Sequence, residues 1–152
     1  MMLAALHIPR VAPIGRDAPL VSATVQQCLP GGGAEGGSAT FAGQMVALPG
    51  AFQMAMRVDL EVHDASESGF HRLSAPGLGV WHRSEPSVKV FRYLAQVTSL
   101  AAPAGYRALI TYRWLDVGGH VMRHAVRHTP VCRQPAPASG AHGEAHAGRA
   151  AA

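Results

Sequence analysis

Apolar and polar residues alternate with a period of two along most of the chain between residues 20 and 132. The clearest stretch runs from Met54 to His63, where Met, Val and Leu side chains alternate with Arg57, Asp59 and Glu61. Successive side chains of a strand point to opposite faces of the sheet. The pattern therefore predicts a strand with one buried and one solvated face, as antiparallel sheets have.

The same alternation recurs in further segments, separated by turns rich in Gly and Pro. It predicts a second clear strand at Tyr106–Leu115 and other strands at Leu20–Gln27, Thr40–Leu48, His71–Ser74, Val88–Val97 and His120–Val131. No segment has the pattern of a helix. About seven strands joined by short turns predict an all-β fold, an antiparallel two-sheet sandwich of the immunoglobulin-like type.

The segment GHVMRHAVRHTP carries three histidines spaced four residues apart, His120, His124 and His128. On a helix, neighbouring histidines would lie about 6 Å apart and could share a metal ion. On a strand they would lie about 13 Å apart, too far to chelate one ion together. The segment follows a strong strand and a Gly-Gly turn, and it lacks a helix cap. We therefore predict a strand, no metal site and no cofactor.

The two ends of the chain lack this alternation. Residues 1–19 contain three prolines, and residues 133–152 are rich in Ala, Gly, Pro and His. Both are predicted to be disordered, which leaves residues 20–132 as the one folded domain. No stretch is long enough to span a membrane, and the N-terminus shows no clear signal peptide.

The net charge of +4 is unevenly distributed along the sequence. Residues 20–85 carry three Lys and Arg against six Asp and Glu, whereas residues 86–132 carry six against one. Acidic and basic strands that pair in one sheet explain this split, and a polyanion-binding face is the alternative. The net charge of residues 20–132 is too small to favour nucleic acid. The candidate polyanion-binding residues are Arg107, Arg113, Arg123 and Arg127.

The chain has two cysteines, Cys28 and Cys132, near the two ends of the alternating region. Two cysteines without C-x-x-C spacing are too few for a zinc site. A disulfide that closes the domain is the simplest use, and it implies an oxidising compartment. Two unrelated buried thiols are the alternative.

The strand that contains Tyr106, Arg113 and Trp114, the turn after it and the segment Thr129–Pro135 resemble a known family. They are similar to the last hairpin of immunoglobulin-like domains in secreted proteins of high-GC bacteria. Such domains often precede repeats of the bacterial cell-adhesion-related domain. The resemblance covers about residues 20–135 and is most specific over residues 105–135.

The resemblance implies an extracellular, non-enzymatic β-sandwich at the cell surface or secreted from it. On this model Tyr106 matches a corner tyrosine whose hydroxyl bonds a nearby backbone group. Cys28 ends the first strand and Cys132 the last, and if these two edge strands run parallel, their ends meet and a bridge is geometrically possible. The strands 54–63, 106–115 and 120–131 share a sheet, which places Asp59 and Glu61 near Arg107 or Arg113.

Two function hypotheses follow from these features. The first is a module for adhesion, spacing or ligand binding, whose partner is a cell-surface protein or an anionic polymer. The second is a small metal-binding or hydrolytic protein that uses His120, His124 and His128, or the carboxylates of Asp59 and Glu61. An alternating strand places two carboxylates on one face without any catalytic purpose, and no nucleophile motif is present. We therefore favour the first hypothesis.

Overall fold

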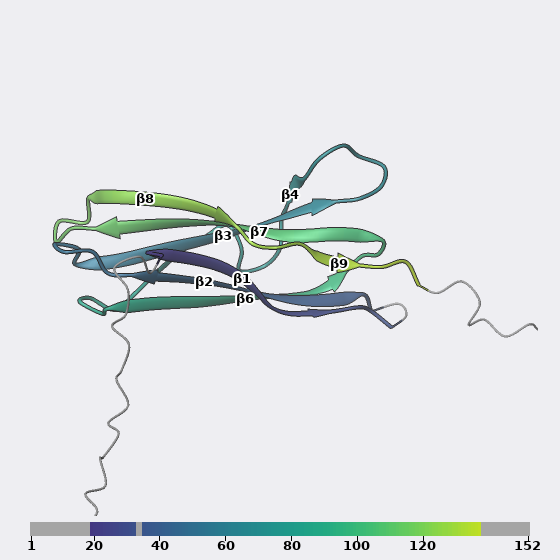
Figure 1. Ribbon diagram of the computed structural model, residues 1–152, viewed down its shortest axis with the longest axis horizontal. Coiled ribbons are helices and arrows are strands. Elements are labelled where there is room, and N and C mark those ends of the chain that lie inside the picture. Colours follow the sequence, from purple (N-terminus) through teal and green to yellow (C-terminus); the bar gives the residue numbers. More distant parts are fainter. Residues whose placement is uncertain (1–18, 33–34, 138–152) are drawn as a thin grey trace, which may run out of the picture.

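The computed structural model describes residues 19–32 and 35–137, and within them the chain forms nine β-strands and no helix. No segment of the described residues is therefore a helix that could cross a membrane. The strands lie in two stacked layers (Figure 1). They are β1 (Val21–Leu29), β2 (Gly37–Val46), β3 (Gln53–His63), β4 (His71–Leu73), β5 (Trp81–Arg83), β6 (Val90–Leu100), β7 (Ala104–Leu115), β8 (Val121–His128) and β9 (Cys132–Gln134).

One layer is a three-stranded sheet with the order β1-β2-β6. The other is a six-stranded sheet with the order β4-β3-β7-β8, in which β5 also pairs with β3 and β9 with β7. All pairings are antiparallel. The prediction of an all-β antiparallel two-sheet sandwich is confirmed, and the predicted strands at 54–63, 106–115 and 120–131 do share one sheet.

Two strands, β5 and β9, are additional to the seven that the alternation predicts. Each has only three residues. The strand β9 also continues to Gln134, whose side chain is buried, so the ordered chain extends past the predicted boundary at residue 132. The rest of the predicted C-terminal tail up to residue 137 forms no strand. Residues 1–18 and 138–152 lie outside the described residues.

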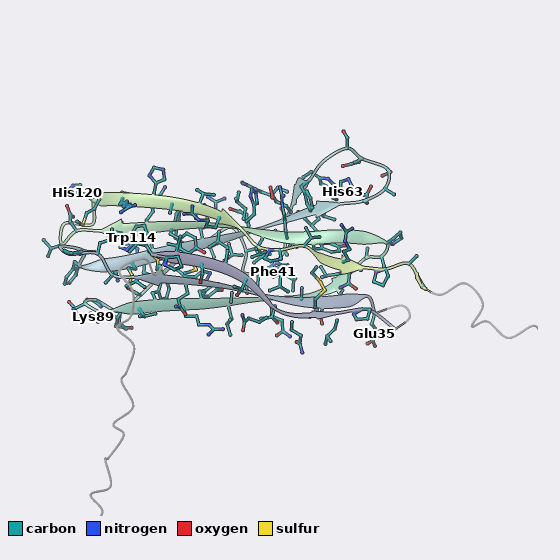
Figure 2. All side chains as sticks on the ribbon, viewed as in Figure 1. Glu35, Phe41, His63, Lys89, Trp114 and His120 are labelled. Carbon is teal, nitrogen blue, oxygen red and sulfur yellow. A yellow bond between two sulfur atoms is a disulfide. The ribbon has the colours of Figure 1, made fainter. Side chains whose placement is uncertain are left out.

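The core lies between the two sheets and is built from the apolar faces of β3 and β7 against β2 and β6. Trp114 and Phe41 lie in this layer (Figure 2), and each is about 1% exposed. At Gly43 on β2 an added Cβ would clash with Met56 Sδ, so the Met56 side chain would have to move to admit a larger residue. The core side chains of β3 and β7 are Met54, Met56, Val58, Leu60, Val62, Tyr106, Ala108, Ile110, Tyr112 and Trp114.

The hydroxyl or N–H groups of three core aromatic residues donate hydrogen bonds to backbone carbonyls. The hydroxyl of Tyr112 donates to Ser22 O on β1 at 2.6 Å, and Trp114 Nε1 donates to Val46 O on β2 at 2.8 Å. Both bonds cross from the six-stranded to the three-stranded sheet. The hydroxyl of Tyr106 donates to Ala101 O at 2.7 Å, five residues upstream, which is the bond expected of a corner tyrosine.

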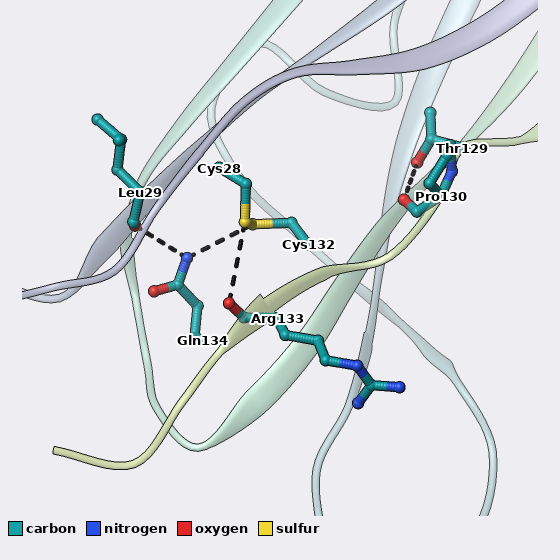
Figure 3. Close-up of a disulfide and its surroundings, with 7 residues drawn as sticks. All are labelled: Cys28, Leu29, Thr129, Pro130, Cys132, Arg133 and Gln134. Carbon is teal, nitrogen blue, oxygen red and sulfur yellow. Dashed lines mark hydrogen bonds between the residues drawn. A yellow bond between two sulfur atoms is a disulfide. The ribbon is translucent and has the colours of Figure 1, made fainter. Parts of the chain in front are cut away.

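A disulfide joins Cys28 on β1 to Cys132 on β9, with an S–S distance of 2.05 Å (Figure 3). The bridge therefore ties the three-stranded sheet to the six-stranded sheet, and the predicted pairing is confirmed. Beside it the buried Gln134 amide donates to Leu29 O at 3.0 Å and to Cys132 Sγ at 3.5 Å. The bond to Leu29 O connects β1 and β9 a second time at the same place.

Loss of this bridge is expected to destabilise the fold strongly. The cysteines are 104 residues apart, and in the chain-entropy model a loop of about 100 residues corresponds to about 4.7 kcal/mol. We expect the Cys28→Ser, Cys132→Ser double variant to lose about 4 kcal/mol of unfolding free energy in urea titrations. Wild-type protein under reducing conditions serves as the control and should behave like the double variant. Equal stability of the oxidised protein and the double variant would contradict the bridge's role.

Burial raises the pKa of Tyr106 and Tyr112 above the usual tyrosine value. In the unfolded chain a tyrosine has a pKa of about 10. A tyrosine whose pKa is higher in the folded state therefore stabilises the fold fully below about pH 10, and this stabilisation is lost as the pH rises from there through the folded-state pKa. We expect the unfolding free energy of the wild type to fall between about pH 10 and pH 11.5. Tyr112→Phe should fall less steeply over this range, measured by urea unfolding at each pH. If the unfolding free energy of both proteins fell equally with pH, ionisation of Tyr112 would not be the cause of the loss of stability at alkaline pH.

Candidate functional site: the outer face of the six-stranded sheet

The outer face of the six-stranded sheet is the surface that points away from the core. It is formed by odd-numbered residues of β3, β5, β7 and β9 and even-numbered residues of β4 and β8, because directly opposite residues of an antiparallel pair share a face. His63, at the end of β3, lies on this side in Figure 2. The face collects most of the charged residues that the sequence singles out.

Glu61 is the centre of one polar cluster on this face. Arg107 Nε donates to Glu61 Oε1 at 2.8 Å from the neighbouring strand, and His128 Nε2 lies 3.1 Å from the same oxygen. The Arg107 guanidinium also stacks on the ring of Phe70, 3.9 Å from its centroid, and His63 lies against the same ring. The expected contact between Glu61 and Arg107 is therefore present.

Asp59 is the centre of a second cluster and is 5% exposed. Arg57 on the same strand donates from Nη2 to Asp59 Oδ1 at 3.2 Å, and its Nε lies 3.1 Å from Oδ2. Arg72 on β4 approaches Oδ1 at 3.9 Å. Asp59 therefore pairs with Arg57 and Arg72, whereas the sequence analysis had placed it near Arg107 or Arg113.

These contacts define the chemistry of the two carboxylates. Each is held by at least one arginine in an ion pair. The geometry of Asp59 and Glu61 is that of structural ion pairs within the sheet.

Arg113 on β7 has a different environment from Arg107. Its guanidinium lies 4.0 Å from the centroid of the Trp81 ring on β5, and it forms no ion pair with any described residue. Cation–π stacking holds the planar group in place without neutralising its charge. The two ends of the outer face thus carry similar arginine–aromatic stacks, but only one of them includes a carboxylate.

The four predicted polyanion-binding arginines do not share one face. Arg107 and Arg113 lie on the outer face, whereas Arg123 and Arg127 are opposite the core-facing residues of β7, Trp114 and Ile110, and therefore point to the other side of the sheet. Arg123 is 6.0 Å from the Trp114 ring. A single patch of all four is not formed, and polyanion binding remains a prediction for two separate pairs.

The three histidines lie on or beside a strand, as expected. His124 and His128 belong to β8, and His120 lies in the turn before it. The backbone N–H of His120 donates to Asp116 Oδ1 at 2.9 Å and, as the largest cause, lowers the pKa of that carboxyl. Among the residues described, no group of three or more His, Cys, Asp or Glu side chains is placed to hold a metal ion.

Several residues of the face were not singled out from the sequence. Phe70, Trp81, Arg72 and Arg83 lie on or beside the short strands β4 and β5. Their position depends on the pairing of β4 and β5 with the edge of β3, which no local pattern specifies.

No family model matches the chain, and no curated protein matches it. The fold defines the class: a two-sheet antiparallel β-sandwich whose sheets are joined by one disulfide. The likeness to bacterial immunoglobulin-like domains remains a prediction from the sequence.

Asp59 is expected to contribute to stability because it is buried and paired with two arginines. Asp59→Asn removes the charge and should lower the unfolding free energy by about 2 kcal/mol, within the range for hydrogen bonds to charged groups. Glu85→Gln is the matched control, because Glu85 is exposed and forms no ion pair with a described residue. Chemical unfolding of both variants at pH 7 checks this, and equal losses would show that Asp59 has no structural role.

Proposed function

We propose that this protein is a non-enzymatic, exported immunoglobulin-like module that binds an anionic cell-surface polymer. The observation that carries the proposal is the charge of the outer face of the six-stranded sheet. Six arginines lie there against two carboxylates, an excess of positive charge that attracts polyanions. The arginines are Arg57, Arg72, Arg83, Arg107, Arg113 and Arg133, and the carboxylates are Asp59 and Glu61.

The opposite surface of the sandwich supports this choice by contrast. The outer face of the three-stranded sheet carries mainly hydroxyl and amide side chains from β1, β2 and β6, with Arg92 as a basic residue. Such a face lacks the charge density that draws in a polyanion. An anionic partner is therefore expected on the six-stranded sheet.

The aromatic residues favour a polymer without bases over nucleic acid. Proteins that bind single-stranded nucleic acid use exposed aromatic rings as platforms on which bases stack. Here Phe70 and Trp81 each already carry a guanidinium on the ring, from Arg107 and Arg113. Carboxylate, phosphate or sulfate groups of a cell-surface polymer are the better match, because arginine binds them through two parallel hydrogen bonds.

Two features support export and a binding role without chemistry. Disulfides persist in oxidising compartments outside the cytosol, and Cys28 and Cys132 form one. Asp59 and Glu61, the carboxylates considered for catalysis, are each held by arginine in an ion pair. A rigid sandwich with a charged face is suited to adhesion or ligand binding.

The proposal predicts salt-sensitive binding to polyanions. We expect the full chain to bind dextran sulfate and polygalacturonate at 50 mM NaCl, with affinity falling at least tenfold at 200 mM because counterion release drives such binding. Neutral dextran should not bind, and a DNA duplex should bind more weakly than either polyanion. Isothermal titration calorimetry gives the affinities. No binding to either polyanion, or preferential binding to DNA, would overturn the proposal.

A further inference from the structure

We infer that the anion-binding site is the acid-free row, the line of outer-face residues Arg83, Arg113 and His124. This inference rests on the proposed function and locates it. The three residues come from β5, β7 and β8, and the sequence alone does not bring them together. The row is defined by strand register, by the absence of carboxylates among its members, and by the stacking of its central arginine.

The register places the three cationic or protonatable groups in one line across four strands. Arg83 is opposite Ala55, Ala55 is opposite Arg113, and Arg113 is opposite His124. Neighbouring strands are about 4.8 Å apart, so the row is about 15 Å long. Ala55 contributes only a methyl group between the two arginines and is 3% exposed, so longer side chains around it cover it.

The stack on Trp81 orients the Arg113 guanidinium before any anion binds. Stacking at 4.0 Å occupies one flat face of the guanidinium, while the N–H donors on its edge remain directed outward in the plane of the group. This fork matches the two oxygens of a carboxylate, phosphate or sulfate. Because the side chain is already oriented, less conformational entropy is lost when the anion binds.

The charge of the row is not compensated within the sheet. The ion pairs of the outer face join Arg57 and Arg72 to Asp59, and Arg107 and His128 to Glu61. None of them includes a residue of the row. Arg83 makes one long contact, from Nη1 to Gln53 Oε1 at 3.4 Å, which leaves its charge intact. The cations of the row therefore have no acidic partner among the described residues.

The other arginine pair is less well prepared for an anion. The Arg123 guanidinium is 6.0 Å from its aromatic neighbour, Trp114, and is thus more loosely held. Arg127 donates from Nη1 to Val126 O at 2.8 Å, so one of its donors is already used. These two residues lie on the opposite side of β8 from the row and cannot contact the same segment of polymer.

The spacing of the row indicates the ligand. Arg113 is one strand from His124 and two strands from Arg83, about 5 Å and 10 Å. An extended polymer with anionic groups repeated at about these intervals can contact all three residues together. The partner is thus an anionic polymer that lies across the strands.

The experiment compares two arginines of one strand that differ in their carboxylate partners. Arg113→Gln and Arg107→Gln each remove one positive charge from the outer face of β7, so any diffuse attraction falls equally in both. We expect Arg113→Gln and Arg83→Gln each to weaken binding of dextran sulfate about tenfold and to reduce the salt slope by about one. Arg107→Gln should weaken it only about twofold. Arg92→Gln, on the other sheet, should bind like the wild type.

Each alternative result has a defined meaning. Equal losses for Arg113→Gln and Arg107→Gln would show diffuse attraction and overturn the row. Losses confined to Arg123→Gln and Arg127→Gln would place the site on the other side of β8, which overturns the row but retains the proposed function. No wild-type binding would remove both. Arg113→Lys keeps the charge and the packed stem but loses the fork, so wild-type affinity in this variant would refute the stacked guanidinium as the anchor.

Discussion

The pairing of β3 with β7 is the constraint on which the rest of the molecule depends. Eleven residue pairs join the two strands without a bulge, from Gln53 opposite Leu115 to His63 opposite Gly105. This one register sends the methionines and large aromatics into the core and the arginines and carboxylates to the outer face. A shift of one residue would exchange the two faces, so core packing and surface chemistry are specified together.

Different interactions stabilise the core and the charged outer face of the six-stranded sheet. The two sheets are held by apolar packing, by hydrogen bonds from Tyr112 and Trp114 to the opposite sheet, and by the disulfide at the β1–β9 end. The outer face is ordered instead by ion pairs and arginine–aromatic stacks, which extend from β3 and β7 to the short strands β4 and β5 at the sheet edge. A surface arranged in this way can present charge from several strands without disturbing the core beneath it.

The sequence predicts β3 and β7 best, because their long alternating patterns indicate both the strand and its buried face. It also predicts the pair Cys28–Cys132, and it places Glu61 near Arg107 or Arg113, of which Arg107 is the partner in the structure. It does not predict the short strands β5 and β9. It also does not predict the partners of Asp59, which come from the same strand and from β4. The stack of Arg113 on Trp81 depends on how a short strand docks on β3, and no local pattern encodes that docking.

The register of β3 against β7 can be measured directly by NMR in solution. Nuclear Overhauser effects between backbone protons of directly opposite residues report which residues face each other across the two strands. The account predicts such contacts between Ala55 and Arg113 and between Glu61 and Arg107. Contacts that pair Arg113 with Met54 or Met56 instead would show a shifted register. Both the core and the acid-free row described above would then be wrong.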